Sequence, residues 1–169
     1  MQNDFLSDSG FYAKTKRSTD MGLAALKKIN ILIEYFRKNN LPIIFIHSLY
    51  GEVEEINLPI NFIQPVDPKG KSKNIPFNDE LRSGSHKQDL NEILSKKLKI
   101  KDLVIVGVAT NYCVKATTID AFHLGYNITI IEDAVGASTK QLHEKAILEI
   151  QKYYAKIQNT DQFTKEMGI

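Results

Sequence analysis

Cys113 is the residue of this chain whose type and position together suggest covalent chemistry. It is the only cysteine among 169 residues, and it closely follows an apolar run at residues 103–108. A helical pattern begins just after that run, so Cys113 is expected in the first turn of a helix. Unpaired N–H groups and the helix dipole favour an anion there, which makes a thiol easier to ionise. The sequence therefore predicts a nucleophilic thiolate at this position.

The elements around Cys113 are typical of an open parallel α/β sheet. Residues 103–108 have the composition of a strand buried on both faces, and we expect this strand to be central in the sheet. Ligands in such folds bind just beyond the carboxyl ends of the strands, which is where Cys113 stands. A lone cysteine among Val, Ala and Thr is also typical of a small buried hydrophobe. Position alone leaves both interpretations open.

The rest of the chain alternates between helix and strand patterns. Residues 20–39 and 88–98 predict helices, whereas residues 41–47 and 126–132 predict buried strands. The first helix should pack through a stripe made of Leu23, Leu26, Ile29, Ile33 and Phe36. Residues 1–18 read as a loop. This alternation predicts a three-layer α/β/α fold with a mainly parallel, Rossmann-like central sheet, in one domain over residues 1–169.

The composition excludes several classes of protein. With 22 Lys and Arg against 20 Asp and Glu, the net charge of +2 predicts no special attraction to nucleic acid or to acidic membranes. A single cysteine rules out an internal disulfide, and the sequence has neither a secretory h-region nor a long apolar span. We therefore expect a cytoplasmic protein without nucleic-acid or membrane partners.

Residues 106–138 also resemble a known family. Their sequence, VGVATNYCVKATTIDAFHLGYNITIIEDAVGAS, is similar to the signature of the isochorismatase-like cysteine hydrolases. This family includes nicotinamidases, N-carbamoylsarcosine amidohydrolases and ureidoacrylate amidohydrolases. The opening residues MQNDF resemble the family's first motif, an apolar strand that ends D-x-Q-x-D-F. Because the element order between the two motifs also fits, the resemblance covers nearly the whole chain.

The resemblance implies a hydrolase of a small amide, ureido or related C–N substrate, acting through an acyl-enzyme on Cys113. Backbone N–H groups of Ala109 and Cys113 would hold the oxyanion, with a cis peptide bond between Val108 and Ala109. Asn111 and Tyr112 would line the pocket, or else serve as a cap and a packing residue. The family also implies a homo-oligomer, either a dimer or a tetramer, and no cofactor is expected.

The start of the chain departs from the family pattern. The family's first strand lies immediately upstream of Met1, and the catalytic Asp of its Asp-Lys-Cys triad is the residue just before that methionine. Asp4 matches the second, structural Asp of the motif, so the catalytic role is not transferred to it. Because the first strand lies in the middle of the family's sheet, its loss would leave two neighbours without partners and uncover an apolar face. Either the sequence starts at an internal methionine, which we favour because the break falls inside the motif, or the protein is an impaired relative.

The family's lysine is the second departure. When the family pattern is overlaid without gaps from Cys113 backward, the lysine position is Glu80. A carboxylate there would raise the pKa of the thiol, whereas the lysine would stabilise the thiolate. If the loop has a shifted register, Lys71, Lys73 or Lys87 could reach the site instead. Replacement and shifted register both stay open.

No metal site can be argued from the histidines. The D-W-H metal-binding sequence of nicotinamidases corresponds here to residues 48–50, Ser-Leu-Tyr, and His47 has no second His at ligand spacing. His123 and His143 fall on helical patterns as ordinary surface or packing residues. The sequence thus leaves two main hypotheses, a working cysteine hydrolase and a catalytically silent relative that binds a small molecule or forms an assembly. A flavodoxin-like binder is a third, but no phosphate-cradling glycine loop supports it.

Overall fold

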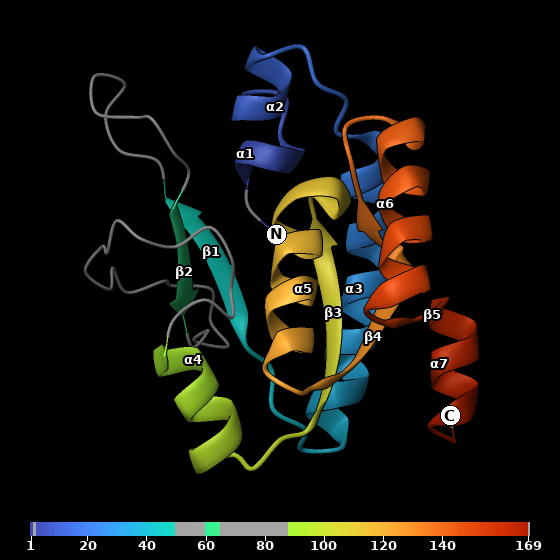
Figure 1. Cartoon of the computed structure of the whole chain (residues 1–169). Coiled ribbons are helices and arrows are strands. Elements are labelled where there is room, and N and C mark those ends of the chain that lie inside the picture. The colour runs from blue at the N-terminus through green and yellow to red at the C-terminus, as the bar shows by residue number, and fades with distance from the viewer. Residues whose placement is uncertain (2, 50–59, 65–87, 169) are drawn as a thin grey trace.

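The structure of the chain is a computed structural model that describes residues 1, 3–49, 60–64 and 88–168 (Figure 1). Its first half contains three helices, a two-stranded antiparallel sheet and a helix that widens into a π-helical turn. In chain order these elements are α1 (Asn3–Leu6), α2 (Phe11–Lys14), α3 (Asp20–Lys38), β1 (Phe45–Leu49), β2 (Ile60–Gln64), α4 (Gln88–Glu92) and η1 (Ile93–Lys97).

The second half of the chain forms a parallel sheet with the strand order β3-β4-β5. Helices connect its strands, as expected of parallel crossovers. The elements are β3 (Asp102–Val108), η2 (Thr110–Val114), α5 (Lys115–His123), β4 (Asn127–Gly136), α6 (Lys140–Tyr153), β5 (Lys156–Gln158) and α7 (Thr160–Glu166). None of the described helices is long and apolar enough to cross a bilayer.

Apolar side chains cover both faces of this sheet. On one face, Leu103 and Ile105 of β3 pack into a cluster with residues of α4, α5 and α6. On the other face, Val104 and Val106 pack against a cluster built from α3, α7 and β4. Helices therefore flank the sheet on both sides (Figure 1), which confirms the predicted three-layer α/β/α arrangement.

β3 is not central in the described sheet, contrary to expectation. It pairs with β4 along one edge, and no other described strand pairs with its second edge. Its residues from Leu103 to Val108 are only half-buried, whereas Ile130, Ile131 and Ala134 of β4 are fully buried. The apolar run correctly predicted a strand, but a strand is fully buried only when another strand pairs with each of its edges.

The strand predicted at residues 41–47 is also different in the structure. β1 begins only at Phe45, and it pairs in antiparallel register with β2 in a separate two-stranded sheet. Ile46 is 38% exposed, so this segment is not the buried sheet strand that its apolar letters predicted. Periodicity cannot tell which strand a segment will pair with, and here the pairing partner is a hairpin neighbour rather than β3.

The packed face of α3 agrees with the predicted stripe except at Leu23. Leu23 is 42% exposed, while Ala25, Ile29 and Leu32 are buried. Of the predicted stripe, Ile33 and Phe36 are only half-buried. Both line an apolar cavity beside β3. The sequence therefore located the helix and most of its packed face correctly, since Ile29 is buried in the core and Ile33 and Phe36 pack against it.

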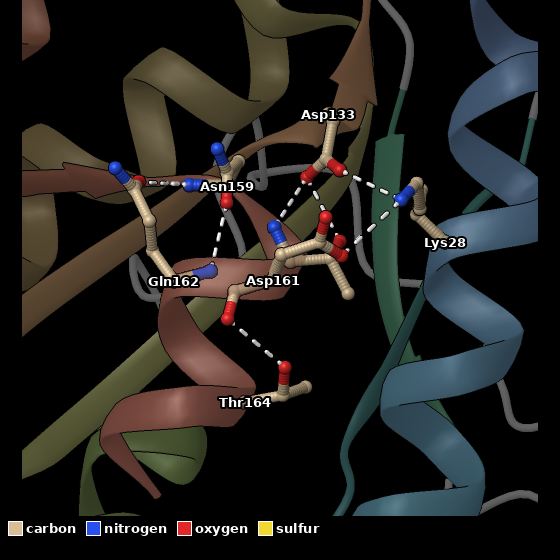
Figure 2. A network of polar contacts seen from close by, with 7 residues as sticks. Lys28, Asp133, Asn159, Asp161, Gln162 and Thr164 are labelled. Atoms are coloured by element: carbon tan, nitrogen blue, oxygen red, sulfur yellow. Dashed lines mark hydrogen bonds and ion pairs between the residues drawn. The ribbon is translucent and has the colours of Figure 1, made fainter. Parts of the chain in front are cut away.

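A polar network joins α7 to the sheet and to α3 (Figure 2). The Asp133 carboxylate accepts hydrogen bonds from the N–H and hydroxyl of Thr160, both at 2.8 Å, and its second oxygen lies 3.4 Å from Lys28 Nζ. Asn159 and Gln162 form a capping box that starts α7. These contacts fix the C-terminal end of the chain against the face of the sheet that α3 covers.

Candidate active site

Cys113 lies in η2, the helical turn that directly follows β3. Its Sγ is 3.0 Å from the carbonyl oxygen of Val108, to which the thiol donates, and the N–H of Ala109 donates to Sγ at 3.1 Å. The peptide bond between Val108 and Ala109 is cis, as the family resemblance implies. The strand, turn and helix predicted around the thiol are therefore present, with backbone groups of two residues directed at the sulfur.

The pKa of the Cys113 thiol is shifted in the direction opposite to our expectation. Burial is the largest influence and raises the pKa above its usual value, whereas backbone N–H groups of Ala109, Val114 and Cys113 itself act to lower it. The N–H donors expected at a helix terminus are present around the sulfur, but desolvation of the thiolate outweighs them.

Part of this burial comes from the first residues of the chain, which the sequence presented as a loop. Residues 3–6 and 11–14 instead form the short helices α1 and α2, which lie at the same end of the molecule as the carboxyl end of β3 (Figure 1). Phe5 and Tyr12 are buried in a cluster with Ala109, and their rings meet edge to face at 5.1 Å. These aromatic side chains therefore cover the turn that holds Cys113.

Tyr12 is a site residue that the sequence did not reveal. Burial raises the pKa of its hydroxyl, and the nearby Cys113 raises it further, while Arg17 acts in the opposite direction. The Arg17 guanidinium carbon lies 5.5 Å from the centre of the Tyr12 ring. The available signal was three aromatic residues, Phe5, Phe11 and Tyr12, in a largely polar segment, and such a signal has no periodicity that would assign it to a site.

His143 also belongs to the surroundings of the turn. Its Nδ1 lies 3.0 Å from the hydroxyl oxygen of Thr110, the first residue of η2, and Thr110 is completely buried. Burial lowers the pKa of His143 below its usual value, although Glu132 and Glu144 act against this shift. Sequence reasoning placed His143 among ordinary surface or packing residues, because the two partners are 33 positions apart.

A cavity of about 1140 Å³ lies beside Cys113. We call it the β3 groove, because every residue of β3 lines it, together with residues 41–46 and side chains of α3 and α4. Met1 and Cys113 also contribute to its wall. The thiol is thus adjacent to a space large enough for a small molecule, and it is not sealed in a dry interior.

The other predicted site residues are placed as follows. Neither Asn111 nor Tyr112 is among the described residues that line the β3 groove, and Tyr112 is 57% exposed, so their pocket role stays a prediction. Glu80 lies outside the described residues, as do its possible replacements Lys71, Lys73 and Lys87. In the described ranges, no three His, Cys, Asp or Glu side chains gather where they could hold a metal ion.

Comparison with known proteins gives related sequences that differ in how much of the chain they cover. A ureidoacrylate amidohydrolase, RutB of Caulobacter segnis, is 34% identical over 59% of this chain, which spans only 42% of that relative. An uncharacterized isochorismatase family protein, YaaI of Bacillus subtilis, is 26% identical over 87% of this chain and 90% of its own length.

Among solved structures, an isochorismatase-like hydrolase from Alkaliphilus metalliredigens is 27% identical, with a TM-score of 0.49 over 53% of this chain and 49% of that chain. The family model described as the isochorismatase domain matches residues 1–162, nearly the whole sequence. Together with the strand, turn and helix that carry Cys113, this match shows that the chain belongs to the isochorismatase family.

Proposed function

We propose that this protein is a cysteine hydrolase that cleaves a small amide, ureido or related C–N substrate through Cys113. The main support is the geometry of the thiol. It lies just beyond the carboxyl end of β3, it borders the β3 groove, and the Ala109 N–H donates to its sulfur at 3.1 Å. Members of the family with amidohydrolase names, such as the Caulobacter segnis relative, agree with this class of reaction.

The proposed reaction has two stages. In the first, Cys113 loses its proton and its sulfur attacks the substrate carbonyl carbon, and backbone N–H groups of Ala109 and Cys113 hold the resulting oxyanion. The C–N bond then breaks, the amine leaves with a proton, and a thioester remains on Cys113. In the second stage water attacks the thioester, the carboxylic acid departs and the thiol is restored.

The hydrogen-bond partners described for the Cys113 sulfur are backbone groups of Val108 and Ala109, and none of them is a base. Burial raises the pKa of Cys113, so the thiol needs a base close to it in order to react near neutral pH. We propose that a carboxylate reaches the thiol from the side of the second edge of β3, with which no described strand pairs. Support for this comes from the apolar side chains of β3, which stay half-buried along that edge.

The hydrolase proposal is tested with two proteins, one starting at Met1 and one extended by the codons that precede it in frame. Each is incubated with a panel of primary amides and ureido acids, and the acyl-enzyme is sought by intact-protein mass spectrometry. We expect the extended protein to hydrolyse one of these compounds and Cys113→Ala to abolish both turnover and the adduct. Hydrolysis that survives Cys113→Ala would contradict the proposal.

A catalytically silent relative is the second candidate, and the raised pKa of Cys113 favours it. Such a protein would bind a small molecule or form an assembly without turnover. The rate of iodoacetamide labelling separates the two candidates, since Cys113 is the only thiol. Fast labelling with a low pH midpoint supports the hydrolase, and slow labelling with a high midpoint in the extended protein supports the silent relative. A homo-oligomer, dimer or tetramer, belongs to either proposal.

A further inference from the structure

The hydrogen bond between Thr110 and His143 connects the Cys113 turn to a distant helix. Thr110 comes directly after Ala109 and begins η2, while His143 lies in the first turn of α6. The two side chains meet at 3.0 Å between the Thr110 hydroxyl oxygen and His143 Nδ1. Thr110 has no exposed surface, so a hydroxyl that lost this partner would have no contact with solvent.

Thr110 is well placed to control the donors around the sulfur. Its neighbour Ala109 supplies the N–H that reaches Cys113 Sγ at 3.1 Å, and the carbonyl of Ala109 accepts from the N–H of Val114 at 3.2 Å. A side chain held from α6 therefore restrains the backbone on which both contacts depend. A small rotation of the turn would lengthen the contact between Ala109 and the sulfur, because hydrogen bonds weaken steeply with angle.

We propose that His143 is a positioning residue: through Thr110 it holds the η2 turn so that the Ala109 N–H faces the Cys113 sulfur. For the oxyanion step, this inference rests on the proposed hydrolase function, since the same N–H would then face the reacting carbonyl oxygen. The effect of His143 on the Cys113 thiolate does not depend on that function, and it can be measured without a substrate.

The state of the His143 ring suits this role. Its pKa lies below the usual value because the ring is partly buried, which favours the neutral form. A neutral imidazole has one donor and one acceptor nitrogen, and Nδ1 in either state can pair with a hydroxyl. The charged groups that act on the ring are Glu132 from β4 and Glu144 from α6, and both favour its protonated form without overcoming burial.

The test uses variants that keep or remove the interacting atom. His143→Asn retains a polar atom close to the position of Nδ1, whereas His143→Gln moves it outward toward the position of Nε2. Thr110→Ser keeps the hydroxyl, and Thr110→Val removes it while the side chain stays β-branched. His123→Asn is the matched control, because His123 is an exposed histidine at the end of α5.

The readout is the pH profile of Cys113 alkylation by iodoacetamide in the whole chain, with the melting temperature of each variant measured in parallel. We expect His143→Gln and Thr110→Val to move the midpoint upward by about half a pH unit, so that labelling below the midpoint slows about threefold. His143→Asn, Thr110→Ser and His123→Asn should stay near wild type. The double variant His143→Gln/Thr110→Val should show no larger shift than either single change, because both remove the same interaction.

A purely structural role would give a different result. If His143→Gln and Thr110→Val lower the melting temperature while the midpoint and plateau rate of folded protein stay unchanged, the positioning role is overturned. Should His143→Gln fail to fold, Thr110→Val alone decides, because its shape is nearly that of the native residue. A shifted midpoint in a protein that hydrolyses nothing sustains the inference and removes the hydrolase. If both variants leave the turnover and the labelling midpoint unchanged, the positioning inference is overturned and the hydrolase proposal stands.

Discussion

The two edges of β3 differ although the strand itself is the same. On one edge β3 runs in parallel register with β4, from the pair Asp102 and Asn127 to the pair Val108 and Gly136. On the other edge no described strand pairs with it, and the β3 groove of about 1140 Å³ follows its length. The paired edge leads to the fully buried centre of the sheet in β4, and the open edge leaves β3 half-buried. An apolar sequence therefore prepares a strand for burial, and its neighbours decide whether burial is completed.

The Cys113 turn lies at the carboxyl end of β3, between the paired side and the open side of the strand. Its backbone contacts to Val108 and Ala109 are complete within the described chain. The proposed base would come from the open side. This division explains how a well-formed nucleophile turn can coexist with a thiol whose pKa is raised.

Truncation of an isoleucine should cost more next to the paired edge than next to the open one. Ile130 in β4 has no exposed surface, so Ile130→Ala should lower the free energy of unfolding by about 2–5 kcal/mol. Ile105 in β3 is half-buried and lines the groove, so Ile105→Ala should cost less than about 2 kcal/mol. Urea denaturation of both variants measures the difference. Equal losses would mean that β3 is packed as completely as β4, contrary to the structure.

Enlargement of a side chain gives the opposite test. Ala134 of β4 is fully buried, so Ala134→Leu should overpack the sheet and cost about 1–3 kcal/mol. Val106 of β3 faces the same side of the sheet but lines the groove, so Val106→Leu should cost less than about 1 kcal/mol. Thermal unfolding followed by circular dichroism gives both values. A large loss at Val106 would show that the groove is already filled in solution.

The polar network at the far side of β4 should contribute less than either core position. Asp133→Asn keeps one acceptor for Thr160 but removes the negative charge that pairs with Lys28 (Figure 2). Because the Asp133 side chain is 30% exposed, we expect a loss of about 1 kcal/mol. Lys28→Met is the matched partner variant, and a double-mutant cycle isolates the interaction between the two charges. A coupling free energy of zero would mean that the ion pair does not help to hold α7 against the sheet.

The smallest effect concerns the pH dependence of stability at His143. Its pKa is lowered in the folded chain, so the unfolded chain binds more protons between the folded pKa and the unfolded value near 6.5. Stability is therefore complete above pH 6.5 and is lost as the pH falls through that window. Replacement by Asn should flatten this part of the profile, as measured by urea midpoints between pH 5 and 8. A steeper acid loss in His143→Asn than in wild type would reverse the sign of the argument.

Several predictions from the sequence rest on local signals, and these are confirmed. The apolar run of β3, the helix that follows it and the place of Cys113 between them are encoded by adjacent residues. The cis bond between Val108 and Ala109 was expected from the family resemblance, and it stands at that position. Predictions that required a distant partner were less successful. The strand expected at residues 41–47 paired within a hairpin, and Leu23 of the expected α3 stripe faces outward.

The candidate site shows the same division. Nothing near Cys113 in the sequence announces that Phe5 and Tyr12 will fold over its turn, yet this packing contributes to the burial that raises the pKa of the thiol. His143 could be assigned to a helix from the sequence, but its contact with Thr110 depends on how α6 lies against η2. Desolvation and side-chain pairing depend on all the surrounding elements, and periodicity describes only one element at a time.

The sequence alone determined that this chain has a two-faced apolar strand, a helix directly after it and a single thiol between the two. These follow from backbone preferences and hydrophobic periodicity over a few neighbouring residues. Only the tertiary structure decided which edge of β3 is paired, how far the thiol is removed from water, and that Thr110 meets His143. Each of these depends on contacts between residues far apart in the chain, which form only when separate elements pack together.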